Sequence, residues 1–340
     1  MLAGIVESFR AVGGNHELVV ISADPSYTIS QHDVSAISRN DYRGMLNAIR
    51  QADAFLSGGG SLFQDATSAR SALYYLAQFW YAVSIAGRPS IVFAQGIGPL
   101  RRMWVRLTAG SVLDRADLIL LRDEPSKTLL AEIGVRRPFV EVTADPSFAL
   151  PPVGKSEGKQ FLEELGIRVS EPVIMVCPRP WESTRWNLGF IEALAAAVRG
   201  IGGTAIFMAL HPSRDTLLAR ELARGVPNSL FIERVLTFRD IRTAIAGADM
   251  VISTRLHGLM FAVCEGIPAV GVSYDPKVEA FCRLCGLPYV RIGAFTPEEM
   301  LTHIRSAWEQ RTSLAAAESV KSEELARAAF RNAELVCELL

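Results

Sequence analysis

Several features that would point to a membrane, a nucleic acid or a disulfide framework are scarce or missing from this sequence. The longest apolar stretch, residues 71–86, is interrupted by Gln78 and Ser84 and falls short of the ~18–20 residues that span a bilayer. The formal net charge is −1, which gives no bulk electrostatic case for nucleic acid. The five cysteines are an odd count, typical of a reducing compartment rather than of paired disulfides.

The start of the chain shows no basic leader followed by a small-residue cleavage site. We therefore expect a cytoplasmic protein that needs no metal or cofactor. A peripheral contact with the inner face of the cell membrane stays open, because the aromatic residues between 74 and 81 are of the kind found at membrane interfaces.

The chain is long and apolar enough for two domains. It has 340 residues, of which 49% are hydrophobic. Apolar strand-like runs alternate with helical runs in two series, and this alternation predicts parallel sheets in two Rossmann-like domains facing a cleft. The first series comprises residues 18–21, 54–56, 90–94, 118–121 and 139–142. The second comprises residues 173–177, 204–210, 229–232, 250–253 and 269–272.

These series place the domains at residues 1–150 and 173–311, separated by a polar, proline-rich and glycine-rich stretch from 151 to 172. Residues 312–340 form a long helical pattern that we expect to cross back and brace the domains.

The stretch 254–258 is the most informative motif. It follows the strand-like run 250–253 and opens a helical run, which places Arg255 and His257 where open α/β sheets bind ligands. An arginine at a helix amino terminus is unfavourable unless an anion lies opposite. The residues therefore suggest an anionic substrate and a proton-transfer group; the alternative is a capping turn whose arginine points into water.

Other cations follow strands of the second series. Arg179 lies between two prolines after the run 173–177, and His211 follows the run 204–210. Lysine is scarce, and Lys277 is the only one of the five lysines next to a strand end in this half. Each residue alone is better explained as structural, whereas Arg179, Arg255, His257 and Lys277 together indicate an anion site.

In the first half, the turns after strands are rich in glycine. Gly58, Gly59 and Gly60 allow a ligand to approach the backbone, and Gln64 and Asp65 could orient a hydroxyl group. The alternative of equal weight is a tight turn before a buried helix.

Further polar residues end the later strands of this half. Gln95 follows the run 90–94, Arg122 the run 118–121, and Asp145 the run 139–142. Arg122 could face the cleft. Asp145 could either form a local turn or contact a ligand.

The order of these motifs resembles the polysaccharide pyruvyl transferase family, and most closely its CsaB-like branch of bacterial cell-wall ketal-pyruvyl transferases. The segments that carry the resemblance run in order from residue 1 to about residue 286: residues 57–65, 95–99, 122–123, 144–146 and 255–257.

The resemblance implies a GT-B-like arrangement with phosphoenolpyruvate as donor. It implies an acceptor N-acetylmannosamine on a lipid-linked or nucleotide-linked saccharide, and a 4,6-linked pyruvate ketal as product, used in attaching S-layers to the cell wall. Arg179, Arg255 and Lys277 would then hold the donor and His257 would transfer protons.

The acceptor would be bound by residues of the first domain, by analogy with GT-B enzymes. These are Gly58, Gly59, Gly60, Gln64, Asp65, Gln95, Arg122 and Asp145.

Family members usually begin with a strand and a glycine-rich turn, whereas the helical spacing of Leu2, Ile5, Val6 and Phe9 starts this chain inside the following helix. We expect that a first strand is missing. Two other functions stay open: a GT-B glycosyltransferase or sugar-nucleotide epimerase, which should carry an acidic nucleotide-binding residue, and a non-catalytic saccharide-binding remnant.

Overall fold

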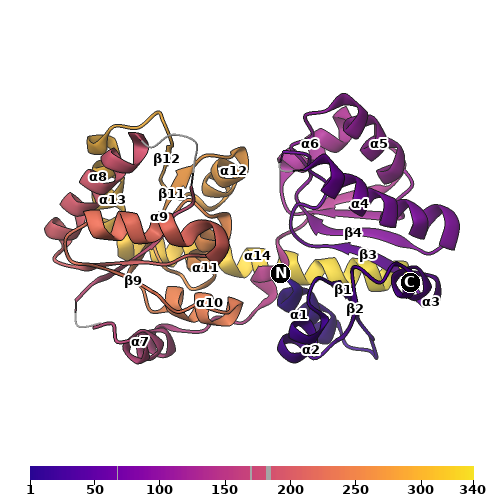
Figure 1. Ribbon diagram of the computed structural model, residues 1–340, viewed down its shortest axis with the longest axis horizontal. Coiled ribbons are helices and arrows are strands. Elements are labelled where there is room, and N and C mark those ends of the chain that lie inside the picture. Colours follow the sequence, from indigo (N-terminus) through magenta and orange to yellow (C-terminus); the bar gives the residue numbers. More distant parts are fainter. Residues whose placement is uncertain (67, 169–170, 181–184) are drawn as a thin grey trace. The chain divides into compact units, whose positions relative to one another are not determined.

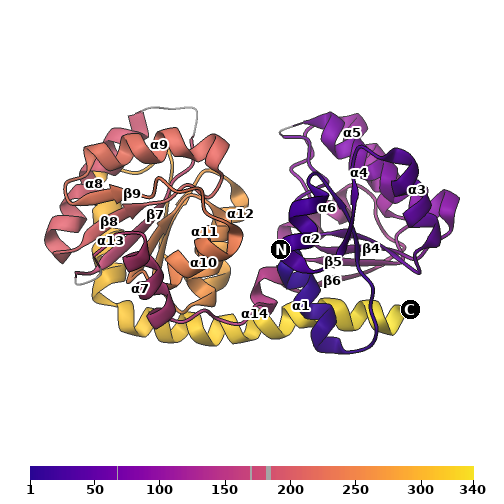
Figure 2. The same ribbon diagram turned by 60° about the horizontal axis from the view of Figure 1, so that its bottom comes forward.

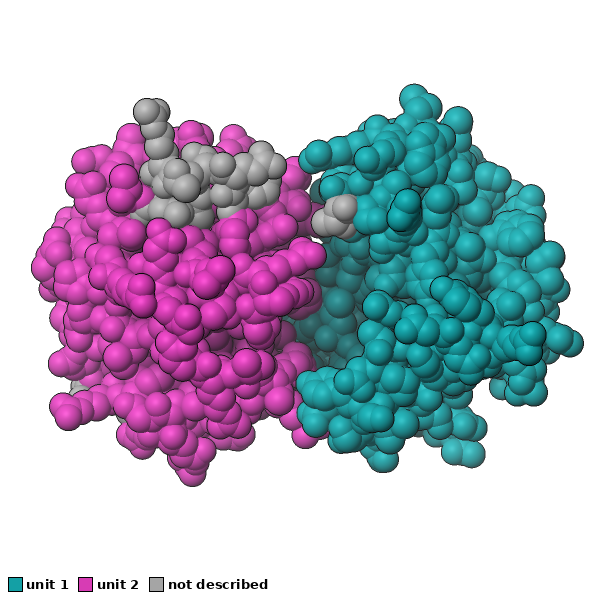
Figure 3. Space-filling view, viewed as in Figure 1, with its two compact units in different colours: residues 1–150, 324–340 teal, residues 151–323 magenta. Residues whose placement is uncertain are grey.

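The computed structural model describes residues 1–66, 68–168, 171–180 and 185–340 (Figure 1). The chain divides into two compact units, Met1–Leu150 with Glu324–Leu340, and Pro151–Glu323 (Figure 3). Every strand pairing in both units is parallel, which confirms the predicted α/β fold class.

The first unit is built around a four-stranded sheet with the order β3-β4-β5-β6. A separate two-stranded sheet pairs β1 with β2. The elements of this unit are α1 (Leu2–Val12), β1 (Val19–Ser22), α2 (Pro25–His32), β2 (Ser35–Ser38), α3 (Tyr42–Gln51), β3 (Phe55–Gly58), α4 (Ala69–Tyr81), the π-helix η1 (Ala82–Ala86), β4 (Ser90–Gln95), α5 (Met103–Leu113), β5 (Leu118–Leu121), α6 (Glu124–Glu132), β6 (Phe139–Val142) and the 3-10 helix η2 (Pro146–Ala149).

Helices cover both faces of the four-stranded sheet. On one face, Val92, Ile119 and Leu121 of the strands pack against α4, α5 and α6. On the other face, Phe93 and Leu120 pack against α1 and the last turns of α14 (Arg311–Leu339). Figure 2 shows α1 and the end of α14 beside this sheet. The strands are therefore apolar on both sides, as a doubly covered parallel sheet requires.

The second unit contains a six-stranded sheet with the order β12-β11-β10-β7-β8-β9. Its elements are α7 (Lys155–Glu164), β7 (Val173–Cys177), α8 (Arg185–Ile201), β8 (Thr204–Phe207), α9 (Pro212–Gly225), β9 (Ser229–Phe231), α10 (Phe238–Ala246), β10 (Met250–Ser253), α11 (Leu256–Cys264), β11 (Ala269–Ser273), α12 (Pro276–Cys285), β12 (Tyr289–Arg291) and α13 (Pro297–Glu309). The last helix, α14 (Arg311–Leu339), begins in this unit and ends in the first.

The strand register of the second unit determines how far along the sheet the candidate residues that follow β7 and β10 are placed. Cys177 of β7 is the Cα partner of Ser253 of β10, and Ser253 is also paired with Gly271 of β11. Arg179 and Arg255, each two residues further along, therefore leave adjacent strands at one level.

The structure adds to or changes the local expectations in three places. The stretch 151–172 is not a simple linker, because α7 lies within it and packs against α10. The strand predicted at 18–21 is present as β1, and it pairs with β2 in a sheet separate from the four-stranded one. Two strands, β2 and β12, were not predicted at all; they have four and three residues, too short for a clear pattern.

None of the helices described is both long enough and apolar enough to cross a membrane.

Candidate functional site

The carboxyl ends of β11, β10, β7 and β8 lie next to one another in the sheet of the second unit. We call the segments that follow them the strand-end rim: residues 274–277, 254–257, 178–180 and 208–215. This rim carries all of the cations that the sequence singled out in this half, namely Arg179, His211, Arg255, His257 and Lys277. Adjacent strand ends of a parallel sheet are where such folds bind ligands.

Arg255 is held in a defined orientation by two neighbours. Its guanidinium pairs through two nitrogens with the carboxylate of Asp215 at the start of α9, with Nε at 3.0 Å from Oδ2. Its backbone is fixed by Ser253, whose hydroxyl accepts the Arg255 N–H at 3.0 Å and donates to the Arg255 carbonyl at 2.8 Å. Asp215 is fully buried, whereas the Arg255 side chain keeps 17% exposure and so reaches solvent.

Gly258 allows α11 to begin directly on the strand ends. A Cβ placed there would lie 2.4 Å from Ser253 Oγ and 3.4 Å from the Cβ of Cys177. Any side chain would thus displace the serine that fixes Arg255. The glycine of the motif is needed for this close approach.

Arg179 is positioned by an aromatic ring from the neighbouring segment. Its guanidinium lies over Tyr274 at 4.2 Å from the ring centroid, and it donates to the tyrosine hydroxyl. Tyr274 follows β11 and Arg179 follows β7, so this contact joins two segments of the rim. A stacked arginine loses less side-chain freedom when it binds an anion.

The other rim residues lie at helix starts. His257 is in the first turn of α11, half-buried, with its ring centroid 6.0 Å from that of Phe261. Lys277 is in the first turn of α12, where its backbone N–H donates to Asp275 at 2.9 Å. His211 is the exposed N-cap of α9, and its Nδ1 lies 3.2 Å from the Ser213 hydroxyl oxygen.

The rim is electropositive although it contains carboxylates. Its four permanent cations, Arg179, Arg214, Arg255 and Lys277, outnumber its two carboxylates, Asp215 and Asp275. The amino ends of α9, α11 and α12 add partial positive charge at the same edge. This arrangement is suited to binding an anion of more than one charge.

Cys177 is not a nucleophile candidate. It is fully buried, and burial, followed by the nearby Asp215 carboxylate, raises the pKa of the Cys177 thiol far above its usual range. A thiol that stays protonated is inert.

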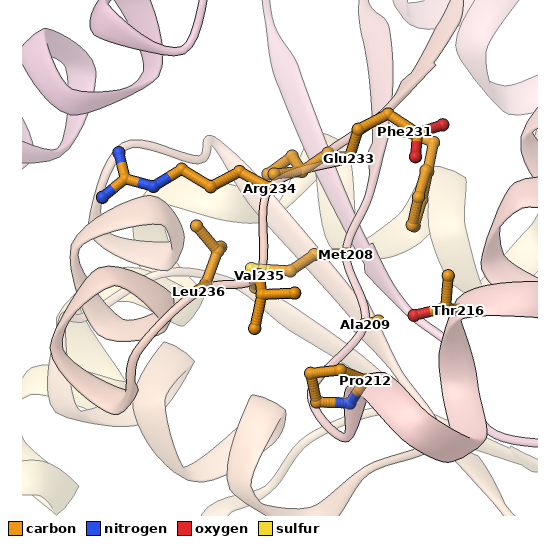
Figure 4. Close-up of a pocket in the computed structure, with 10 residues that line it drawn as sticks. Met208, Ala209, Pro212, Thr216, Phe231, Glu233, Arg234, Val235 and Leu236 are labelled. Carbon is orange, nitrogen blue, oxygen red and sulfur yellow. The ribbon is translucent and has the colours of Figure 1, made fainter. Parts of the chain in front are cut away.

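A shallow hollow adjoins the His211 side of the rim (Figure 4). It is lined by Met208 and Pro212 from the segment after β8, by Phe231 at the end of β9, and by residues 232–236 after it. The charged residues on its lining are paired outside it, Glu233 with Arg220 and Arg234 with Asp240. The lining of the hollow is part polar and part apolar.

The first unit gathers a second cluster at its own strand ends. Arg122, which follows β5, donates to Asp145 after β6 at 2.7 Å and to Ser61 after β3 at 3.2 Å. A Cβ on Gly96, after β4, would lie 3.1 Å from both Arg122 Nε and Ser61 Oγ. Segments that follow all four strands thus meet around the Arg122 guanidinium, which is buried with its partner Asp145.

Two of the predicted acceptor residues make extensive contacts within the unit. Gln95 is buried and its amide nitrogen donates to the Ser57 carbonyl at 2.6 Å and hydroxyl at 2.8 Å. Asp65 is buried and its two oxygens accept the backbone N–H groups of Arg101 and Arg102 at 2.7 and 2.8 Å. These contacts explain both residues as supports for the turns, and a role in ligand binding stays a prediction.

The glycine turn adopts the backbone conformation for which its glycines are required. Gly59 and Gly60 have φ of 69° and 77°, which favours glycine, and follow Gly58 at the end of β3. Met1 lies against this turn, since a Cβ on Gly60 would be 3.1 Å from its Cε. Gln64 comes next, half-buried, with its backbone N–H donating to Leu62.

Sequence reasoning missed Asp215 and gave Tyr274 no role. Asp215 looks like an ordinary acidic residue in the first turn of a helix, and it does accept the His211 N–H at 2.9 Å. Nothing in its local pattern signals that it also holds an arginine that follows another strand.

A family model described as polysaccharide pyruvyl transferase matches residues 1–276. The chain belongs to the polysaccharide pyruvyl transferase family. The matched region contains Arg179, Arg255, His257 and the whole first-unit cluster, and it ends one residue before Lys277.

Among curated proteins, this chain is similar to the amylovoran biosynthesis protein AmsJ of Erwinia amylovora. The two are 23% identical over 260 residues, which are 71% of this chain and 61% of AmsJ. The chain thus spans less than two thirds of that relative's length.

Solved structures with a similar fold include Anabaena Alr3699/HepE in complex with UDP and glucose, at a TM-score of 0.68 and 15% identity over 99% of this chain and 95% of that one. Another is the UDP-GlcNAc 2-epimerase of Neisseria meningitidis bound to UDP-GlcNAc. Its TM-score is 0.64, with 13% identity over 99% of this chain and 95% of that one. At such identities the likeness shows the fold alone. It agrees with the two Rossmann-like domains that the sequence predicted.

Proposed function

We propose that this pyruvyl transferase family member transfers the pyruvyl group of phosphoenolpyruvate to a sugar residue of a cell-wall polysaccharide precursor. The acceptor we propose is N-acetylmannosamine, with a 4,6-linked ketal as product and phosphate as leaving group. The observation that carries the proposal is the strand-end rim, where Arg179 and Arg255 leave adjacent strands at one level within the region that the family model matches.

The donor's two anionic groups suit the cations of the rim. Phosphoenolpyruvate carries a carboxylate and a phosphate, and arginine offers a planar pair of donors to each. Arg255 is already oriented by Asp215 and Arg179 by Tyr274, so both would bind with little loss of freedom. Lys277, in the first turn of α12, would add a point charge.

The reaction balances with one proton donor and two sugar hydroxyls. His257 gives a proton to the methylene carbon, which becomes the methyl group, while the first hydroxyl oxygen bonds to C2 and passes its own proton back to the imidazole of His257. The second hydroxyl oxygen then bonds to C2 as the C2–O bond to phosphate breaks, and its proton leaves with the phosphate. Histidine is the side chain whose imidazole most readily gives and takes a proton near neutral pH, as this transfer requires.

On the acceptor side, we divide the predicted acceptor residues according to the contacts that they make within the first unit. Asp65 and Gln95 hold turns together, so we assign contacts with the sugar first to the backbone of Gly59 and Gly60 and to Gln64. Arg122 and Asp145 would act by shaping the cluster from which these groups project.

The test is phosphate release from phosphoenolpyruvate with a saccharide acceptor that ends in N-acetylmannosamine. His257→Gln should lower kcat by roughly 10²–10⁴ with little change in the phosphoenolpyruvate KM, because the cations remain. His303→Gln, on α13, is the matched control and should behave like the unaltered protein. Near-normal turnover in His257→Gln would move the proton-transfer role elsewhere, with His211 next.

A parallel incubation with UDP-sugars distinguishes the other enzyme class. Release of UDP, or epimerised sugar nucleotide, without any reaction of phosphoenolpyruvate would refute the proposed transfer and favour the glycosyltransferase or epimerase alternative.

A further inference from the structure

The first two turns of α5 expose three large apolar side chains to solvent. Met103 is 67%, Trp104 47% and Leu107 66% exposed. Successive helix residues are turned by about 100°, so these three occupy roughly one quadrant of the helix. The opposite side, with Val105 and Ala109, packs into the core of the first unit.

This helix is thus apolar on both faces, whereas a surface helix ordinarily presents polar residues to water. Single exposed apolar residues need no explanation, but three adjacent ones including a tryptophan mark an interaction surface. We call residues 101–107 the α5 surface.

The α5 surface is also positively charged. Residues 99–113 contain Arg101, Arg102 and Arg106 and no acidic residue. Arg106 is paired with Glu132 at 3.1 Å, and Arg102 lies 3.7 Å from the buried Asp65.

For Arg101, the ion pairs among the described residues include no acidic partner. It stands just before the amino end of α5, whose N-cap residue, Arg102, makes no capping bond through its side chain. The carboxylate of Asp65, which accepts the backbone N–H groups of Arg101 and Arg102, offsets the helix end and the Arg102 charge, so the exposed charge that favours an anionic partner is that of Arg101.

We propose that the α5 surface binds the anionic surface of a lipid bilayer. Met103, Trp104 and Leu107 would enter the boundary between headgroups and acyl chains, and Arg101 would meet lipid phosphates. Interfacial helices combine these features: an apolar face, an amphipathic aromatic residue and flanking basic residues.

A protein partner suits the surface less well. Stable protein interfaces bury about 800 Å² on each partner. The α5 surface comprises seven residues, whereas each side of such an interface comprises about 20–30 residues. A bilayer needs no such matched area, because each inserted side chain contributes independently.

This inference does not depend on the proposed reaction, and it can be tested without any substrate. Co-sedimentation compares vesicles of phosphatidylcholine alone with vesicles that contain about one third phosphatidylglycerol. We expect binding to the anionic vesicles that weakens with added salt. The double variant Met103→Glu/Leu107→Glu should lose roughly tenfold or more of this binding, and Arg101→Glu should lose a smaller part.

Leu217→Glu is the matched control, since Leu217 is a leucine on α9 that is 80% exposed. It should bind vesicles like the unaltered protein. Brominated lipids should quench part of the tryptophan fluorescence, and this part should be absent in Trp104→Phe, which keeps the helix intact.

Three results would overturn the proposal. The first is equal binding of the unaltered protein and the double variant to anionic vesicles, and the second is binding by neither. The third is a change of oligomeric state in the double variant, seen by sedimentation velocity, without any change in vesicle binding; that outcome would make the α5 surface an interface between copies of this chain.

Discussion

Replacing Asp215 with asparagine tests whether the buried carboxylate holds Arg255 ready for an anion. The substitution keeps the size of the side chain but removes the charge that pairs with the guanidinium. Removing one partner of a buried ion pair costs about 3–5 kcal/mol. Because the Arg255 side chain keeps 17% exposure and water can replace part of the contact, we expect a loss of about 2–3 kcal/mol in the free energy of unfolding.

The effect on donor binding follows from the same contact. Without the carboxylate, Arg255 has a choice of side-chain orientations, and binding an anion must fix one of them. If this ordering and the lost alignment cost about 2 kcal/mol, phosphoenolpyruvate affinity falls by about 30-fold. Turnover at saturation should change much less, since His257 is not in this pair.

The assay is calorimetric titration with phosphoenolpyruvate, together with urea unfolding, for Asp215→Asn, Arg255→Ala and the double variant. If the two residues act as one unit, the double variant should bind no more weakly than the worse single variant. Glu338→Gln is the control, because it removes the charge of Glu338 from its exposed ion pair with Arg331 in the first unit. It should change neither the phosphoenolpyruvate affinity nor the free energy of unfolding measurably. Strictly additive losses in affinity would refute the idea that Asp215 works through Arg255.

The sheets could be read from the sequence wherever strands are buried on both faces. Residues 118–121, 173–177 and 250–253 are continuous apolar runs, and β5, β7 and β10 have these same bounds. The strands β1 and β2 form a small sheet of their own with polar and half-buried positions, and their pairing is set by tertiary packing instead of by a pattern.

The sequence predicts where the candidate residues lie, but it does not predict which other residues hold them in place. The rule that ligands lie at strand ends leads to Arg179 and Arg255 from sequence alone. Their partners are out of reach of local reasoning, because Asp215 is 40 residues from Arg255 and Tyr274 is 95 residues from Arg179. For Asp65 the sequence pattern leaves out a structural role. A polar residue after a glycine turn is typical of a ligand contact, whereas in the structure the Asp65 carboxylate accepts hydrogen bonds from two backbone N–H groups of its own unit.

Two further predictions concern packing and charge in the second unit. Gly258→Ala should lower stability by about 1–3 kcal/mol and weaken donor binding, because the added Cβ meets Ser253 Oγ at 2.4 Å; Gly189→Ala, in α8 with only ordinary contacts, should be neutral or slightly stabilising in the same unfolding experiment. Glu318 of α14 is 1% exposed and its carboxylate oxygens make no hydrogen bond of normal geometry to a described residue. Burial raises the pKa of Glu318 from 4.5 to about 8, against a smaller lowering by the Ala269 backbone. The folded protein therefore keeps this proton at pH values where the unfolded chain has lost it. The benefit of the neutral carboxyl is complete below about pH 4.5 and is lost as the pH rises through 8. Since each pH unit between these values corresponds to about 1.4 kcal/mol, Glu318→Gln should stabilise the protein by up to about 5 kcal/mol at pH 9 and hardly at all near pH 4.5. Urea unfolding at both pH values checks this, and an equal effect at the two would mean that Glu318 is not held neutral in the folded protein.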